Sequence, residues 1–316
     1  MLKTRPHRKH VFLLTVPRCG SHLLHRILST QPDCDLSSYH FFSAWLGTRF
    51  ENHYSKVGPL DTLPGEQRKE LDKRFQKKYE ELQSALQASE TAVEHVLFLI
   101  NPLNIFTTRY PEDTGSPFEV SYPPASDVNT SNVEKPQRTS PCIVPDNFLL
   151  SIEPVFQIRH PALMFPSAAR ATRDSMKPGK DPDGPFDDHL QSLMWSRLLY
   201  DWYVKNGINP IVIDADDVMC DDRSTVQRLC DATGLDANHL LYEWKPKTDE
   251  TGFQARFLST LNASTGVVQG LTSEGIDIKA EEEKWKAEFG EEWGDIIARR
   301  VRTAIPDYEW LCARKL

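Results

Sequence analysis

The sequence predicts an α/β fold with three layers, in which a central, mainly parallel sheet is flanked by helices. Short continuous apolar runs recur along the chain, and the segments between them place apolar residues at helical spacing. Strands buried on both faces have this continuous apolar character, which is typical of parallel sheets covered by helices. No internal repeat and no linker divides the sequence, so we expect one domain over residues 1–316.

Four apolar runs predict the strands of this sheet. The first, "HVFLLTV", leads directly into a helical pattern, and the third, "PVFQIRHP", ends at a proline. Runs of this length bounded by turn residues are typical of buried strands. We expect strands at residues 10–16, 95–100, 154–161 and 210–218.

Helical periodicity accounts for most of the remaining chain. The longest pattern, residues 66–88, has Leu71, Phe75, Leu82 and Leu86 on one face and many charges on the other, which indicates a solvated surface. We expect helices at residues 21–29, 66–88, 187–205, 224–233 and about 280–302, the last with Trp285, Phe289 and Trp293 at four-residue spacing. Residues 107–142 are rich in Pro, Ser, Thr and Asn and predict a long irregular insertion.

Composition restricts the class of protein. The net charge of −8 argues against a nucleic-acid binder, and no apolar stretch approaches the roughly 18–20 residues that span a bilayer. The first apolar run is too short for a signal-peptide core, so we expect a cytoplasmic protein without a membrane partner. The six cysteines form no CxxC pair and no zinc pattern, so we expect reduced thiols and no metal site.

The stretch "LLTVPRCGSHLLHRIL" places a basic loop between the first strand and the first helix. Arg18, Gly20 and Ser21 occupy this loop, with Ser21 as the expected N-cap of the helix. Strand-to-helix loops of parallel sheets are common anion sites. Neither GxxxxGK[ST] nor GxGxxG is present, so an ATP- or GTP-hydrolysing loop and a dinucleotide site are disfavoured. The alternative is a capped turn with a surface arginine.

A second pair of residues favours the anion site. Arg159 follows the third predicted strand, and Ser167 comes eight residues later at the start of a helical segment. Arginine offers a bidentate charged contact and serine a hydroxyl donor, so the two can bind one phosphate together. Taken alone, Arg159 could equally be a surface or ion-paired arginine.

These motifs together resemble the PAPS-dependent sulfotransferases (PAPS is 3′-phosphoadenosine 5′-phosphosulfate). "TVPRCGSHLLHRIL" is similar to their 5′-phosphosulfate loop, with arginine in place of lysine, and "RHPALMFPS" to their 3′-phosphate motif. "PIVIDADDVMCDDRSTVQRLCDATGL" resembles a later strand and helix, and "LSTLNASTGVV", 258–268, lies where the family has a loop that closes over the nucleotide. The order and spacing agree over about residues 10–235. "VPDNFLLSIEPVFQIRHPALMFPS" most resembles a fungal branch of sulfotransferase-like proteins of secondary metabolism.

The resemblance implies a P-loop-like fold and a set of binding residues. The 5′-phosphosulfate of PAPS, or the 5′-phosphate of its product adenosine 3′,5′-bisphosphate, would lie on Arg18, Cys19, Gly20, Ser21 and His22. Arg159 and Ser167 would hold the 3′-phosphate, and Thr265 and Gly266, with Arg256, would cover the nucleotide. Arg18 would supply positive charge at the bridging oxygen, and no metal is required.

The sequence departs from the family where the acceptor's proton is usually removed. The fungal branch tends to carry Lys-Glu-His after the second strand, whereas this chain has Ile100, Asn101 and Pro102, none of which is a base at neutral pH. Substitute candidates are His22, kept neutral by the helix dipole, His40 in an aromatic segment, and Glu153. Cys19 replaces the usual hydroxyl residue, either as a reactive thiol or as a small buried filler. His160 is expected to be a packing histidine.

Two functions therefore remain open. The first is sulfuryl transfer from PAPS to a hydroxyl or amine of a small, largely apolar metabolite, with Phe41, Phe42, Trp45 and the 107–142 loop around the acceptor. The second is a repurposed sulfotransferase fold that performs a PAPS-independent cyclisation, elimination or condensation, or only binds a ligand. A homodimer through the C-terminal helix is also open.

Overall fold

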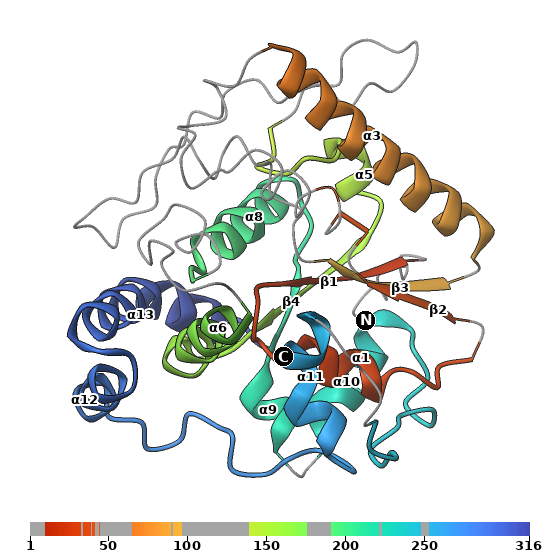
Figure 1. Cartoon of the computed structure of the whole chain (residues 1–316). Coiled ribbons are helices and arrows are strands. Elements are labelled where there is room, and N and C mark those ends of the chain that lie inside the picture. The colour runs from red at the N-terminus through yellow and green to blue at the C-terminus, as the bar shows by residue number, and fades with distance from the viewer. Residues whose placement is uncertain are drawn as a thin grey trace.

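A parallel sheet forms the centre of the computed structural model, which describes residues 10–32, 34–38, 40–41, 44, 65–89, 91–96, 139–175, 191–220, 223–247 and 253–316 (Figure 1). Within these ranges the strand order is β2-β3-β1-β4-β5, and every pair is parallel. The strands are β1 His10–Thr15, β2 Cys34–Ser38, β3 Thr91–Val96, β4 Glu153–Ile158 and β5 Ile211–Asp214. The predicted fold class is confirmed.

Apolar layers cover both faces of the sheet. Phe12 and Leu14 of β1 point into one core and Val11 and Leu13 into the other, as the alternation of a strand requires. The first core is covered by α3 Gly65–Ala88, α5 Asp146–Leu149, α6 Pro161–Ser175, α8 Met194–Lys205, α12 Ile278–Phe289 and α13 Glu291–Cys312. The second is covered by α1 Ser21–Ile27, α9 Ala215–Met219 and α10 Ser224–Thr233, with α11 Phe253–Ala263 beside α1 (Figure 1).

The predicted strands agree with the structure at β1 and need correction elsewhere. β3 begins at Thr91, four residues before the predicted start, and residues 97–100 lie outside the described residues. β4 ends at Ile158 because Pro161 begins α6. β5 ends at Asp214, where its carboxylate accepts the amide N–H of Asp216 at 3.1 Å and starts α9. The polar edge strand β2 carries no apolar run, and the sequence did not predict it.

The predicted helices are confirmed best where amphipathic spacing is regular. The pattern at 224–233 matches α10, and Phe75, Leu82 and Leu86 of α3 are buried; the Leu71 side chain lies outside the described residues. α1 ends at Ile27, two residues early, and α8 begins only at Met194. Of the insertion at 107–142, residues 107–138 lie outside the described part.

The predicted helix at 280–302 is wrong, because two helices occupy this region. Gly290, with a φ of +88°, ends α12, and α13 then packs back along it. A Cβ on Gly294 would lie 2.7 Å from the backbone of Lys286, so the close packing of the two helices requires glycine there. Trp285 is buried, while Phe289 and Trp293 are partly buried.

The C-terminal end of the chain is attached to the edge of the sheet at β5. The Leu316 amide donates to the Val212 carbonyl at 2.9 Å, and the Tyr308 hydroxyl donates to the buried Asp214 carboxylate at 2.6 Å. No helix in the described ranges is long and apolar enough to cross a membrane.

Replacing Tyr308 with Phe should destabilise the fold by about 1–3 kcal/mol, because the buried Asp214 carboxylate loses a donor. Urea unfolding measures this loss. In the matched variant Tyr200→Phe the lost acceptor is the neutral amide of Asn209, at 3.2 Å, so the expected loss is smaller, about 0.5–1.5 kcal/mol. Equal losses of stability in the two variants would contradict the stabilising role of the bond between Tyr308 and Asp214.

Candidate functional site

Arg18, Arg159 and Ser167 form one cluster at the carboxyl ends of β1 and β4. The two strands are neighbours, and their register pairs Thr15 with Gln157. One terminal nitrogen of Arg159 donates to the carbonyl of Arg18 at 3.3 Å, and Nε of Arg18 donates to the Ser167 hydroxyl at 2.9 Å. The structure therefore joins residues of the two predicted motifs that lie 149 positions apart.

The first loop is tight because two of its residues are left-handed. Arg18 has a φ of 69° and Gly20 a φ of 81°, so the chain turns sharply before α1. Gly20 is the N-cap, which corrects the prediction that Ser21 caps this helix; Ser21 is its first residue and is buried. A Cβ on Gly20 would also lie 3.2 Å from the methyl group of Met219. Backbone conformation and packing both favour glycine here.

Gln157, which sequence reasoning missed, supports this loop from β4. Its side-chain amide donates to the carbonyl of Cys19 at 3.1 Å, and its Oε1 is buried without a hydrogen-bond partner among the described residues. The only sequence signal was a polar residue inside the apolar run "VFQI". Cys19 itself is completely buried, and burial raises the pKa of its thiol. A thiol that stays protonated is a poor nucleophile, so the structure favours the packing role of Cys19.

Residues 253–273, which we call the cover segment, lie over the arginine cluster. The Phe257 carbonyl accepts from Arg18 at 2.6 Å, and the Leu271 carbonyl accepts from Arg159 at 2.8 Å. The ring of Phe257 also lies under the Arg18 guanidinium, with 5.6 Å between the ring centroid and the Cζ atom of Arg18. The predicted loop at 258–268 is corrected, because residues up to Ala263 belong to α11. The Arg256 side chain donates a hydrogen bond to the Ser259 hydroxyl of the same helix at 3.4 Å.

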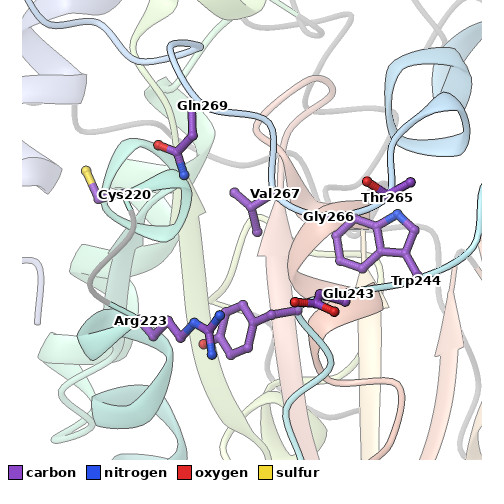
Figure 2. A pocket seen from close by; sticks show the side chains of 9 residues that line it. Cys220, Arg223, Glu243, Trp244, Thr265, Gly266, Val267 and Gln269 are labelled. Atoms are coloured by element: carbon purple, nitrogen blue, oxygen red, sulfur yellow. The ribbon is translucent and has the colours of Figure 1, made fainter.

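A cavity of about 390 Å³ adjoins the cover segment (Figure 2). The predicted residues Thr265 and Gly266 line it, and their strand-like segment pairs with Glu243 and Trp244. A Cβ on Gly266 would lie 3.0 Å from the Tyr242 carbonyl, so the two segments approach closely. Sequence reasoning missed the other lining residues: Cys220, Arg223, Tyr242, Glu243, Trp244, Val267 and Gln269.

The candidate bases lie in different surroundings. His22 is half-buried on α1, and burial, with the positive charges of His25, Arg18 and Arg26, lowers its pKa to about 4. The predicted neutral state agrees with this, although burial is the main cause. His40 lies near α3. The pKa of Glu81 on this helix is lowered mainly by its hydrogen bond with Lys78, and the charge of His40 makes a smaller contribution. A role for either histidine as a base stays a prediction.

The positions of three further side chains bear on their predicted roles. Glu153 opens β4 opposite Val11, at the amino ends of these strands and away from Arg18, so its position does not favour a role as the base. Phe41 is buried and stacks on Phe75 of α3, with ring centroids 6.2 Å apart, so it is a core residue. His160 packs edge-on against the ring of Tyr308, as expected. Residues 97–102, Phe42 and Trp45 lie outside the described residues.

The described residues contain no group of three or more His, Cys, Asp or Glu side chains placed to hold a metal ion.

Acid should reveal the neutral state of His22. The pKa of His22 is lowered from 6.5 to about 4 in the native protein. At a pH between these two values, His22 is protonated in the unfolded chain but neutral in the native protein. Stability should therefore fall as the pH drops through this window, by about 3 kcal/mol more in the native protein than in a His22→Gln variant. Urea unfolding at pH 7 and pH 4 measures the difference. An NMR titration of the His22 ring with a midpoint near 6.5 would contradict it.

Comparison with known proteins gives relatives along the whole chain. No protein-family model matches the sequence. It is 31% identical over 337 aligned positions to the sulfotransferase ppzF of Metarhizium majus, covering 96% of each chain. The sulfotransferase ppzF of Metarhizium rileyi is also 31% identical, over 96% of this chain and 95% of its own. Among solved structures, the sulfotransferase domain from the Synechococcus PCC 7002 olefin synthase aligns over 88% of this chain and 92% of its own, with 13% identity and a TM-score of 0.39.

Identity of 31% along nearly the full length of both fungal relatives shows that this protein belongs to the sulfotransferase family.

Proposed function

We propose that the protein transfers a sulfuryl group from PAPS to a hydroxyl or amine of a small, largely apolar metabolite. The observation that supports this most is the cluster of Arg18, Arg159 and Ser167, in which two basic motifs far apart in the sequence share one edge of the sheet. Two arginines that follow neighbouring strands, on a protein of net charge −8, support a local site for a doubly phosphorylated ligand.

The hydrogen bonds of the two arginines suit an anion. Arg18 donates to a hydroxyl and a carbonyl, and Arg159 donates to two carbonyls, so these acceptors carry no formal charge. Nε of Arg159 is buried and has no hydrogen-bond partner among the described residues. Burial also lowers the pKa of Arg159, although not to values where arginine loses its proton. A phosphate oxygen would satisfy the remaining donor and the charge together.

The residues divide between the parts of the nucleotide. Arg159 and Ser167 would hold the 3′-phosphate, and Arg18 would lie at the 5′ group, where PAPS supplies an activated sulfuryl group when bound. The cavity beside Thr265 and Gly266 would take the adenine, since Tyr242 and Trp244 give it aromatic rings among polar groups. The part of the cover segment from Thr265 to Leu271 links this cavity to Arg159.

Catalysis in this proposal depends on charge and orientation. Arg18 stabilises negative charge at the oxygen that leaves sulfur, and it is held for this by Ser167 and the Phe257 carbonyl. The acceptor atom must approach in line with that oxygen. His22 is neutral at pH 7 and lies on the first turn of α1, so its imidazole is the proposed proton acceptor.

Calorimetry with adenosine 3′,5′-bisphosphate tests the nucleotide site. We expect micromolar binding by the intact protein and a loss of at least about thirtyfold in Arg159→Ala, because a desolvated charged contact is removed. Arg170→Ala is the matched control, since Arg170 lies one turn after Ser167 on α6 and pairs with Glu288 at 2.7 Å instead. This control should bind normally.

Adenosine 5′-monophosphate separates the two arginines in the same experiment. It lacks the 3′-phosphate, so Arg159→Ala should weaken its binding much less than that of the bisphosphate, whereas Arg18→Ala should weaken both. No detectable binding of the bisphosphate by the intact protein would reject the sulfotransferase proposal.

Ile100, Asn101 and Pro102 favour a second candidate, a repurposed fold that works without PAPS. Incubating the protein with metabolite extracts, with and without PAPS, distinguishes the two by mass spectrometry. A product heavier by one SO₃ that needs PAPS supports transfer. A product formed equally well without PAPS, through loss of water or with unchanged composition, supports the second candidate.

A further inference from the structure

Asp216, in the helix α9 that follows β5, connects the end of the cover segment to the carboxyl ends of the strands. Its Oδ2 accepts two hydrogen bonds from Ser273, one from the amide N–H at 2.7 Å and one from the hydroxyl. Ser273 lies two residues after Leu271, whose carbonyl accepts from Arg159. The end of the cover segment, residues 271–273, is therefore attached at two neighbouring points, once to Arg159 and once to Asp216. We call the Asp216–Ser273 contact the latch.

The position of Asp216 is determined by β5. Asp214 ends this strand opposite Ile158, the residue just before Arg159. The Asp214 carboxylate accepts hydrogen bonds from the Asp216 amide N–H and from the Tyr308 hydroxyl. These two bonds fix the turn from β5 into α9, and with it the position of Asp216. Asp216 and Arg159 thus leave adjacent parallel strands at the same edge.

Asp216 acts on Arg159 without touching it. Oδ1 of Asp216 and Nε of Arg159 are both buried and have no hydrogen-bond partner among the described residues, so the two side chains do not pair directly. Their charges still interact, since Asp216 partly offsets the lowering of the Arg159 pKa by burial. Ser273, rather than Arg159, therefore fixes the orientation of the Asp216 carboxylate.

We propose that Asp216 is a positioning residue that holds the cover segment closed and, through Leu271, keeps the Arg159 guanidinium oriented toward the 3′-phosphate. The proposal rests on the proposed function. Asp216 itself needs no contact with the nucleotide, because its effect passes through Ser273 and Leu271. A closed cover segment retains the bound nucleotide, so the latch acts mainly on dissociation.

Ser273→Ala is the cleanest test, since it removes one donor of the latch without changing any charge. We expect adenosine 3′,5′-bisphosphate to dissociate roughly fivefold to tenfold faster in stopped-flow measurements, with a nearly unchanged association rate. Amides of residues 268–273 should exchange hydrogen faster in the free protein, while the midpoint of global unfolding stays close to that of the native protein. A merely structural role would shift that midpoint instead.

Asp216→Asn tests the other partner of the latch. This change also removes a negative charge near Arg159, which by itself favours anion binding, so a double-mutant cycle with Ser273→Ala is needed to isolate the latch. Adenosine 3′,5′-bisphosphate should dissociate from the double variant no faster than from whichever single variant releases it faster. Asp217→Asn is the matched control: it makes the same charge change one residue away, but Asp217 pairs with Lys315 at 2.7 Å, so dissociation should be unchanged.

The results separate the latch from the proposed function. Dissociation within twofold of the native rate in both latch variants, with unchanged exchange of residues 268–273, overturns the latch. If the native protein binds no bisphosphate, the proposed function falls and the role toward the 3′-phosphate falls with it. Faster exchange in Ser273→Ala would then still establish the latch as a structural contact, and unchanged exchange would remove it as well.

Discussion

The parallel pairing of β1 with β4 is the interaction on which the candidate site depends. Because the two strands run in the same direction, the residues that follow them leave the sheet at the same edge. The register that pairs Thr15 with Gln157 puts Arg18 and Arg159 close enough for the carbonyl of one to accept from the guanidinium of the other. A shift of one residue in this pairing would turn the side chains to opposite faces and separate the two cations.

Backbone carbonyls orient the guanidinium groups of Arg18 and Arg159. The carbonyls of Arg18, Phe257 and Leu271 all accept from this pair. Carbonyl oxygens carry only partial charges, so they orient the cations without neutralising them. An aspartate paired directly with Arg159 would compete with an anion for this guanidinium. Asp216, whose charge acts on Arg159, is turned to Ser273 instead.

The sequence predicted those parts of the structure that depend on local patterns. Regular amphipathic spacing identified α10 to the residue. Two short basic motifs singled out Arg18, Arg159 and Ser167, which the fold brings together; that these residues bind a nucleotide stays a prediction. Strand β2 was missed because an edge strand needs no apolar run, and the break at Gly290 because one glycine was read as part of a longer pattern. The acceptors Phe257 and Leu271 were unpredictable for another reason: they contribute carbonyls, and any residue type provides a carbonyl. The cavity beside Trp244 likewise arises only where distant segments meet.

Different parts of the chain provide the charged groups of the candidate site and the segments that enclose them, so the short motifs alone do not form it. Residues up to Ser167 provide the charged groups, whereas the segments from Asp214 onward enclose them. The five-residue helix α9, which carries Asp216, is too short to be stable alone, so its position depends on contacts with the rest of the fold. Tyr308 of α13 supplies one of these contacts, through the Asp214 carboxylate that caps α9. In our proposal the orientation of Arg159 therefore depends on a helix more than fifty residues away along the chain. The contacts run from Tyr308 through Asp214 to Asp216, and from there through Ser273 to the segment that carries Leu271.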